Sequence, residues 1–306
     1  MINKSVIVTG AHGFLGRYAA RRFAEDGYVV TGVGHGNWER SEFSEFGISS
    51  WHSEDVGLEL LMKCEVEPSF IVHCSGGASV PFSISDPIQD FQRTVANTAI
   101  VLEYIRLHSP KTILVYPSSA AVYGRAATLP ISENDPLRPI SPYGVHKLLA
   151  EQLCKSYAEN FRVSVAVVRF FSLYGEGLRK QLLWDACSRF KSGVNEFCGT
   201  GLELRDWLHV EDAADLLFLA ATHGSTSCPV VNGGSGDGVS VRNVLEMLVG
   251  EFGGKSDLDF SGVPRSGDPP GYQADTSTVK SWGWESKVSL REGIQRYAAW
   301  FKEDCV

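Results

Sequence analysis

The chain has 306 residues, 43% of them hydrophobic and 31 of them glycine, with a formal net charge of −8. This length is enough for one large α/β domain or two smaller ones, and the acidic balance argues against nucleic acid as a partner. The seven cysteines lie apart in sequence and indicate neither a disulfide framework nor a metal site, so we expect reduced thiols in the cytoplasm.

Membrane attachment is not expected either. No apolar run approaches the ~18 residues of a membrane-spanning helix. We recognise no signal peptide before the first predicted strand, which agrees with a cytoplasmic location. The sequence therefore predicts no membrane partner.

A strand, a glycine turn and a helix open the chain. The β-branched run over residues 5–9 predicts a buried parallel strand, and an amphipathic helix is expected over 17–25. Between them stand the turn residues Gly10, Gly13, Phe14, Leu15 and Gly16. Glycines at such a turn let backbone amides approach a pyrophosphate at the helix N-terminus. This order of elements predicts a dinucleotide-binding domain of the Rossmann type.

The second strand, residues 29–33, ends where the cofactor's ribose is usually read. A site that prefers NAD places Asp or Glu there to bind the 2′-hydroxyl, but this chain has Gly34. Without a carboxylate, a 2′-phosphate is not repelled, and His35, Asn37 and Arg40 could receive it. The turn therefore favours NADP(H) as the cofactor, and NAD(H) is the alternative. The alternative is that these polar side chains are solvated loop residues.

Tyr143 and Lys147 lie four residues apart in a predicted helix, so their side chains share one face. A tyrosine phenol has a pKa near ~10 in water, and a nearby ammonium favours the phenolate and lowers that pKa. Such a phenol can exchange a proton with a carbinol or a ketone while hydride moves elsewhere. An ordinary amphipathic helix can show the same spacing, so the pair gains weight only from its context.

The spacing G-x-x-G-x-x-G, joined to Tyr143-x-x-x-Lys147, resembles the extended short-chain dehydrogenase/reductase family of nucleotide-sugar epimerases, dehydratases and reductases. The resemblance runs in order from Gly10 to Asp275. It implies an α/β fold with a doubly wound parallel sheet and a smaller C-terminal α/β substrate lobe. The dinucleotide domain is expected over 1–171 with return segments at 206–233, and the lobe over 172–205 and 234–306.

The family's motifs assign roles to further residues. Ser119, at the end of a strand, matches the catalytic Ser/Thr, with Ser118 beside it facing the substrate. Asp55 and Val56 match the pair that reads adenine, although Asp55 could equally cap a helix. The cofactor loop is matched by Cys74, Ser75 and Gly76, and Thr94 stands where the family often has asparagine.

Substrate residues are expected in the second half of the chain. Ser172 stands where the family usually has an asparagine, and Arg205 matches an arginine that holds the nucleotide diphosphate. An arginine fork suits phosphate, although Arg205 could instead pair with a neighbouring carboxylate on the surface. Arg265 and Asp268 resemble the family's R-x-G-D segment, which binds phosphates and ribose, or else belong to a plain surface loop.

Two absences narrow the reaction. The family's 4,6-dehydratases carry Asp-Glu after the catalytic hydroxyl, and the enzymes that make GDP-fucose carry a cysteine; this chain has Ala120 and Ala121 there. The preferred interpretation is reduction at C4 of an NDP-4-keto-6-deoxyhexose in deoxysugar or polysaccharide biosynthesis. The alternative is a 4-epimerase with tightly bound NAD, and a more remote one is a non-catalytic regulator. The resemblance also implies a homodimer.

Overall fold

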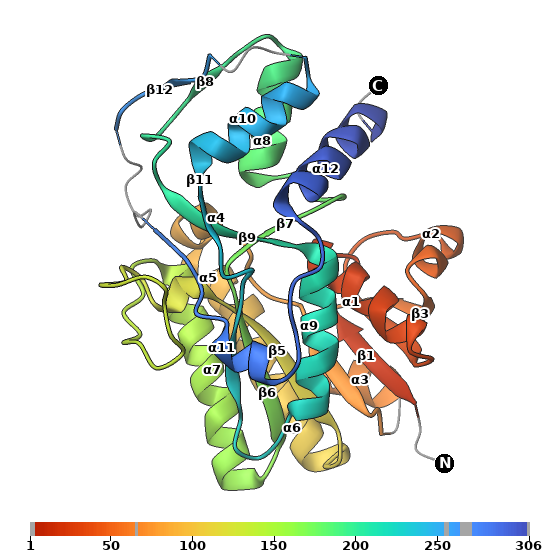
Figure 1. Ribbon diagram of the computed structural model, residues 1–306. Coiled ribbons are helices and arrows are strands. Elements are labelled where there is room, and N and C mark those ends of the chain that lie inside the picture. Colours follow the sequence, from red (N-terminus) through yellow and green to blue (C-terminus); the bar gives the residue numbers. More distant parts are fainter. Residues whose placement is uncertain (1–3, 65–66, 254–256, 264–270, 305–306) are drawn as a thin grey trace. The chain divides into compact units, whose positions relative to one another are not determined.

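The computed structural model describes residues 4–64, 67–253, 257–263 and 271–304 (Figure 1). The chain forms two compact units. The first unit takes in residues 1–124, 137–170 and 214–231, and the second takes in 125–136, 171–213 and 232–306. Each is described by itself.

A seven-stranded parallel sheet forms the centre of the first unit, in the order β10-β6-β5-β4-β1-β2-β3. Its strands are β1 (Ser5–Thr9), β2 (Val29–Gly34), β3 (Ile48–Ser53), β4 (Phe70–His73), β5 (Ile113–Ser119), β6 (Ser164–Phe170) and β10 (Val230–Gly233). The chain winds from β1 to β2 and β3 in one direction and then from β4 to β6 in the other. In open α/β sheets, ligands bind at such a reversal, beyond the carboxyl ends of the strands. Here that point lies after β1 and β4, where the glycine turn and the Cys74 loop begin. The predicted doubly wound fold is confirmed.

Helices pack on this sheet. They are α1 (Phe14–Glu25), α2 (Arg40–Glu45), α3 (Leu58–Cys64), α4 (Val80–Ser85), α5 (Pro87–Phe91), the π-helix η1 (Gln92–Ala96), α6 (Asn97–His108), the 3-10 helix η2 (Ala120–Val122) and α7 (Pro142–Phe161). Helix α6 packs between α3 and α7. The core beneath them is built from fully buried aliphatic side chains such as Ile7, Ile71, Leu102 and Leu114. Between β4 and β5, α5, η1 and α6 follow one another without a break, with a π turn between two α segments.

The second unit is built from short strands and helices. Its strands are β7 (Ser172–Tyr174), β8 (Glu196–Phe197), β9 (Leu204–His209), β11 (Gly238–Ser240) and β12 (Asp259–Phe260). Its helices are α8 (Gln181–Lys191), α10 (Val241–Glu251), α11 (Ser277–Ser281) and α12 (Leu290–Asp304), while α9 (Val210–His223) begins in this unit and ends in the first. Strand β9 pairs in parallel with β7 and antiparallel with β11.

Candidate active site

The glycine turn after β1 is shaped by close backbone contacts. Gly10 has φ +68°, and a Cβ there would lie 2.7 Å from the Ser75 amide nitrogen. A Cβ on Gly16 would lie 2.2 Å from the Gly10 carbonyl oxygen. Gly13 is the N-cap of α1, so no side chain of its own covers the first amides of that helix. This tight turn at a helix N-terminus fits the pyrophosphate of a dinucleotide.

The end of β2 is occupied by an indole ring. Cβ atoms on Gly32 and Gly34 would lie 3.1 and 3.0 Å from the ring of Trp51 on β3. Gly34 therefore makes room for Trp51. The packing of this indole explains why position 34 has no carboxylate, and a cofactor with a 2′-phosphate is not needed to explain it. His35 is exposed, and its Nε2 lies 2.9 Å from Oδ1 of Asp55. The structure thus brings together two predicted cofactor residues, His35 and Asp55, by a mutual contact.

The remaining predicted residues near this end are placed as follows. Asn37 and Arg40 are both exposed, the latter as the first residue of α2, whereas Val56 is buried. Phe14 and Leu15 form the half-buried start of α1.

The loop after β4 is held to β1 and to the π-helix. Thr9 bonds its hydroxyl to Nδ1 of His73 at 2.7 Å and accepts the Ser75 amide at 3.3 Å. The Gly77 amide donates to the Thr94 hydroxyl at 2.8 Å. Burial raises the pKa of the Cys74 thiol to about 12, against a smaller lowering by Lys147. Cys74 is therefore a neutral thiol, and Thr94 has a backbone partner.

Ser119 and Tyr143 come together although 24 residues separate them in sequence. Ser119 is the last residue of β5, and Tyr143 lies in the first turn of α7, where the N-cap Ser141 accepts the Gly144 amide at 3.2 Å. The Tyr143 amide donates to the Ser83 hydroxyl at 3.0 Å. The Ser119 hydroxyl lies close enough to the Tyr143 phenol to lower the pKa of that phenol.

The electrostatics of Tyr143 differ from the expectation. Burial raises the pKa of its phenol, the Ser119 hydrogen bond lowers it by less, and Asp90 raises it further. Lys147 donates instead to the Pro117 carbonyl at 3.0 Å, and burial lowers the pKa of its amine to about 8. The predicted lowering of the tyrosine pKa by lysine is therefore wrong for this arrangement, because desolvation of the phenol outweighs the other influences.

The side chain of Ser118 is buried and hydrogen-bonded within the core. It is 4% exposed, and its hydroxyl donates to Glu151. Glu151 in turn accepts from the Arg169 guanidinium at 2.8 Å. These contacts link β5, β6 and α7 and use the hydroxyl that was expected to face the substrate.

Sequence reasoning missed a buried pair beside Tyr143. Asp90 on α5 and His146 on α7 lie 2.6 Å apart between Oδ2 and Nδ1. The only available signal was that His146 follows Tyr143 by three residues and so shares its helix face. The partner, 56 positions earlier in the chain, gave none.

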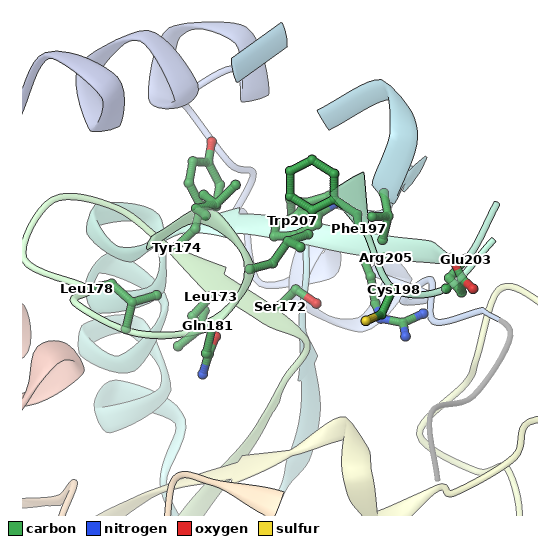
Figure 2. A pocket seen from close by; sticks show the side chains of 14 residues that line it. Ser172, Leu173, Tyr174, Leu178, Gln181, Phe197, Cys198, Glu203, Arg205 and Trp207 are labelled. Atoms are coloured by element: carbon green, nitrogen blue, oxygen red, sulfur yellow. The ribbon is translucent and has the colours of Figure 1, made fainter. Parts of the chain in front are cut away.

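A pocket of about 270 Å³ lies within the second unit (Figure 2). Ser172 and Arg205, both predicted to bind substrate, line it together, and Figure 2 shows them with Phe197, Cys198 and Trp207. The Arg205 guanidinium also donates to the Leu204 carbonyl at 2.8 Å. The neighbouring Asp206 is buried and accepts backbone amides at Ser235, Gly236 and Ala274. Arg265 and Asp268 lie outside the described residues.

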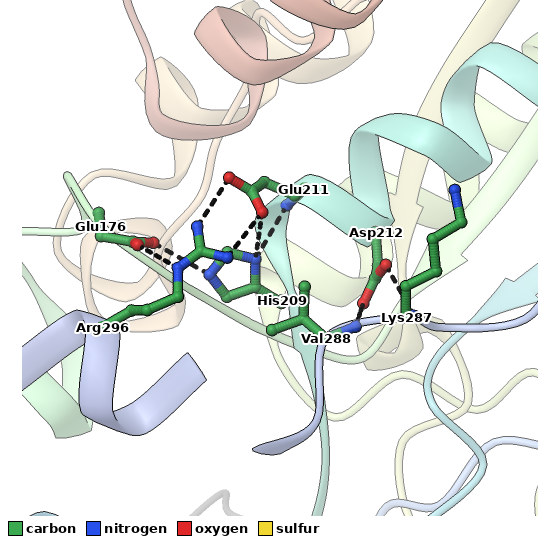
Figure 3. Close-up of polar contacts among 7 residues, drawn as sticks. All are labelled: Glu176, His209, Glu211, Asp212, Lys287, Val288 and Arg296. Atoms are coloured by element: carbon green, nitrogen blue, oxygen red, sulfur yellow. Dashed lines mark hydrogen bonds and ion pairs between the residues drawn. The ribbon is translucent and has the colours of Figure 1, made fainter. Parts of the chain in front are cut away.

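Beside this pocket a charged cluster anchors α12 (Figure 3). Arg296 donates to Glu176 at 2.7 Å and to Glu211 at 2.7 Å, and the fully buried ring of His209 contacts Glu176 at 3.0 Å. Burial opposes ionisation of Glu176, but its hydrogen bonds lower the pKa to about 2. The edge of the His209 ring packs on the pocket residue Tyr174. The cluster is a structural support for the pocket wall.

Neither a metal-binding cluster nor a membrane-spanning helix is found among the described residues. They contain no group of three or more His, Cys, Asp and Glu side chains that could hold a metal ion. Within the same part of the chain, no helix has the length and hydropathy needed to cross a membrane.

Comparison with known proteins places this geometry among nucleotide-sugar enzymes. The profile of the family described as "NAD dependent epimerase/dehydratase family" matches residues 6–232. The UDP-glucose 4-epimerase of Azospirillum brasilense is 27% identical over 96% of this chain and 90% of its own length. UDP-arabinose 4-epimerase 1 of Arabidopsis thaliana is 28% identical over 97% of this chain and 79% of its own length.

Solved structures agree with this placement. MoeE5 in complex with UDP-glucose and NAD superposes with a TM-score of 0.85 at 28% identity, over 99% of this chain and 100% of that one. A UDP-N-acetylglucosamine 4-epimerase from Methanobrevibacter ruminantium, with UDP-N-acetylmuramic acid bound, gives a TM-score of 0.88 over the same shares. At 22% identity the latter shows the fold alone.

Proposed function

The chain belongs to the NAD dependent epimerase/dehydratase family, and we propose that it is a nucleotide-sugar 4-epimerase that uses NAD. Curated relatives that span nearly the whole chain are 4-epimerases of UDP sugars. They favour the alternative left open by the sequence over the preferred reduction of a 4-keto-6-deoxyhexose. The single observation that carries the proposal is that Ser119 at the end of β5 lies with Tyr143 and Lys147 at the start of α7, where Lys147 donates to the Pro117 carbonyl of β5. No dehydratase acid follows Ser119.

NAD rather than NADP is the proposed cofactor. MoeE5 holds NAD, and the relatives give no support to the NADP preference inferred from Gly34. The packing of Trp51 supplies a different reason for that glycine. The residues that would hold the cofactor are Gly10, Gly13, Phe14, Leu15 and Gly16 in the turn, Asp55 and Val56 after β3, and Cys74, Ser75 and Gly76 after β4. When bound, NAD supplies an acceptor for the C4 hydride and returns the same hydride.

The chain's own residues move the proton. Tyr143 takes the C4 hydroxyl proton and returns it after the sugar has turned over, so no net oxidation occurs. Ser119 donates a hydrogen bond to the C4 oxygen and is itself within hydrogen-bonding reach of the phenol. Lys147 is positively charged below its pKa of about 8, and its hydrogen bond to the Pro117 carbonyl fixes its amine at the end of β5.

The pocket of the second unit is proposed to hold the nucleotide diphosphate. Arg205 supplies a planar guanidinium, which matches phosphate oxygens in pairs. Ser172 offers a short hydroxyl on the same wall, and Phe197 and Trp207 supply aromatic surface. Arg265 and Asp268 remain proposed substrate contacts from the sequence alone.

We also propose that the enzyme is a homodimer. Exposed apolar side chains gather on α4, α5 and α7 of the first unit, with Ile84 at 65% and Ile88 at 67% exposure, together with Val145 and Leu149. A second copy covering this surface would remove it from water. Light scattering of the purified protein should give twice the monomer mass.

The reaction is tested with purified enzyme and a panel of UDP sugars and UDP-keto sugars. We expect interconversion of a C4 epimer pair without added reduced cofactor and with no lasting change in nicotinamide absorbance. A variant Ser119→Ala should lose about tenfold to a hundredfold in kcat. Stoichiometric use of NADPH with a keto sugar, and no epimerisation, would establish the reductase alternative instead.

A further inference from the structure

A buried carboxylate that the proposed chemistry does not use lies next to the catalytic residues. Asp90 is fully buried on α5, and its Oδ2 contacts Nδ1 of His146 at 2.6 Å. Its other oxygen, Oδ1, has no hydrogen-bond partner among the described residues. Buried polar atoms are nearly always paired, because desolvation without a partner costs free energy. An exception of this kind beside a reactive site calls for a functional reason.

The surroundings hold Asp90 in one position. A Cβ on Gly77 would lie only 1.9 Å from Oδ1, so the carboxylate sits directly against the backbone of the loop after β4. Thr94, in the π-helix that follows α5, accepts the amide of the same Gly77 at 2.8 Å. His146 contacts the carboxylate from α7. The Phe91 ring packs edge to face with the His146 ring, with 5.6 Å between the ring centroids. Asp90 thus joins three segments that carry predicted site residues.

The charge of Asp90 reaches both members of the Tyr143–Lys147 pair. It raises the pKa of the Tyr143 phenol, and it raises the pKa of the Lys147 amine against the larger effect of burial. Other titratable groups act on one member of the pair. Lys147 is reached by Cys74 after β4, by Glu151 and Cys154 on α7, and by His73 on β4. The Tyr116 ring on β5 lies 5.0 Å from the Lys147 amine and is also reached by Tyr143, and Ser119 acts on Tyr143. Asp90 is therefore the carboxylate acting on both residues at once.

We propose that Asp90, held in place by His146, is a positioning residue for the Tyr143–Lys147 pair. The His146 bond fixes the carboxylate beside the first two turns of α7. From there its negative charge favours the protonated Lys147 amine and makes the Tyr143 phenolate a stronger base for the C4 proton. The kinetic part of this inference rests on the proposed epimerase function, but the charge effect on Tyr143 does not.

Replacing Asp90→Asn removes the charge and keeps the shape. The ionisation of Tyr143 is measured from tyrosinate absorbance against pH, with the same experiment on Tyr143→Phe backgrounds subtracted. We expect Tyr143 to ionise about one pH unit lower in the variant, since a like charge nearby disfavours the phenolate. The acid limb of kcat/KM should move in the same direction. Glu159→Gln is the matched control: it removes an exposed carboxylate from α7, the helix of Tyr143, and should cause no shift.

A second pair of variants tests the bond from His146 to Asp90, and it is informative even if Asp90→Asn does not fold. His146→Asn retains a donor near the position of Nδ1, whereas His146→Leu removes it. We expect His146→Leu to lose roughly tenfold to a hundredfold in kcat with little change in KM, as for misplaced catalytic groups, and His146→Asn to stay within about twofold.

Three outcomes overturn the inference. The first is an unchanged Tyr143 ionisation in Asp90→Asn, and the second is equal activity of the two His146 variants. The third is a loss of thermal stability alone, with both pH profiles preserved, which would make the pair merely structural. Because tyrosinate absorbance needs no substrate, it decides the charge effect even if no UDP sugar is epimerised. Epimerisation by the wild type with no shift in Asp90→Asn would retain the function and reject the inference.

Discussion

Two buried polar clusters include residues of α7 that lie five positions apart, His146 and Glu151, and they differ in how fully they are paired. At Glu151 both carboxylate oxygens accept from Arg169, and one also accepts from the Ser118 hydroxyl. Arg169 in addition donates to the Tyr123 hydroxyl at 3.0 Å. At Asp90 one oxygen is paired with His146 and the other has no hydrogen-bond partner in the described part of the chain.

The difference separates a structural from a functional use of buried charge. A fully paired network rigidifies the fold, because each group has lost its water and gained partners in return. An incompletely paired charge is retained where its field acts on something else, and the residues within its reach are Tyr143 and Lys147. Replacements near the N-terminus of α7, at Tyr143 or His146, should therefore affect turnover, and replacements at Glu151 should affect stability.

Tyr143→Phe should have the largest effect. Loss of the phenol oxygen removes the group that moves the C4 proton, so kcat should fall by roughly a thousandfold. The melting temperature and the bound cofactor should be unchanged, since the ring remains. Assays of epimer interconversion beside thermal melts measure both. Retained turnover would contradict the central role of this residue.

Glu151→Leu should give the opposite pattern. It leaves the Arg169 guanidinium buried without its carboxylate, which costs about 3–5 kcal/mol in the free energy of unfolding. Urea denaturation measures this loss. As the control, Glu151→Leu combined with Arg169→Met should recover most of the stability. If the single variant loses less than about 1 kcal/mol, the cluster is not the structural anchor described here.

An effect that appears only at acid pH is expected from His73, which lies near Lys147. Burial, and then the Lys147 cation, lower the pKa of His73 to about 3, below the ~6.5 of an unfolded histidine. The unfolded state therefore binds more protons between these values. The stabilising contribution is complete above pH ~6.5 and is lost as the pH falls toward 3, by at most about 1.4 kcal/mol per unit.

The variant His73→Asn tests this pH dependence because it no longer titrates but can still bond to the Thr9 hydroxyl. Its unfolding free energy, measured by denaturant from pH 7 to pH 4, should vary less steeply than that of the wild type. Parallel curves for the two proteins would assign the acid sensitivity to other groups, such as Glu176, whose pKa is lowered to about 2.

Local patterns in the sequence were sufficient for the architecture and for part of the site. The order of strand, glycine turn and helix predicted a dinucleotide-binding domain, because hydrophobic runs and glycine spacing report the shape of the backbone directly. The doubly wound sheet was implied by the family resemblance of the motifs. The four-residue spacing of Tyr143 and Lys147 likewise follows from the geometry of one helix. Ser119 could be placed because a strand's carboxyl end is a fixed point in such a sheet.

The tertiary structure alone decided which partners these residues have. Asp90 meets His146 across 56 positions, Trp51 fills the space left by Gly34, and Ser118 turns to Glu151. It also decided the sign of the Tyr143 pKa shift, since desolvation depends on everything that surrounds the phenol. Burial and long-range pairing arise only when distant segments pack together, so neither spacing nor composition could show them.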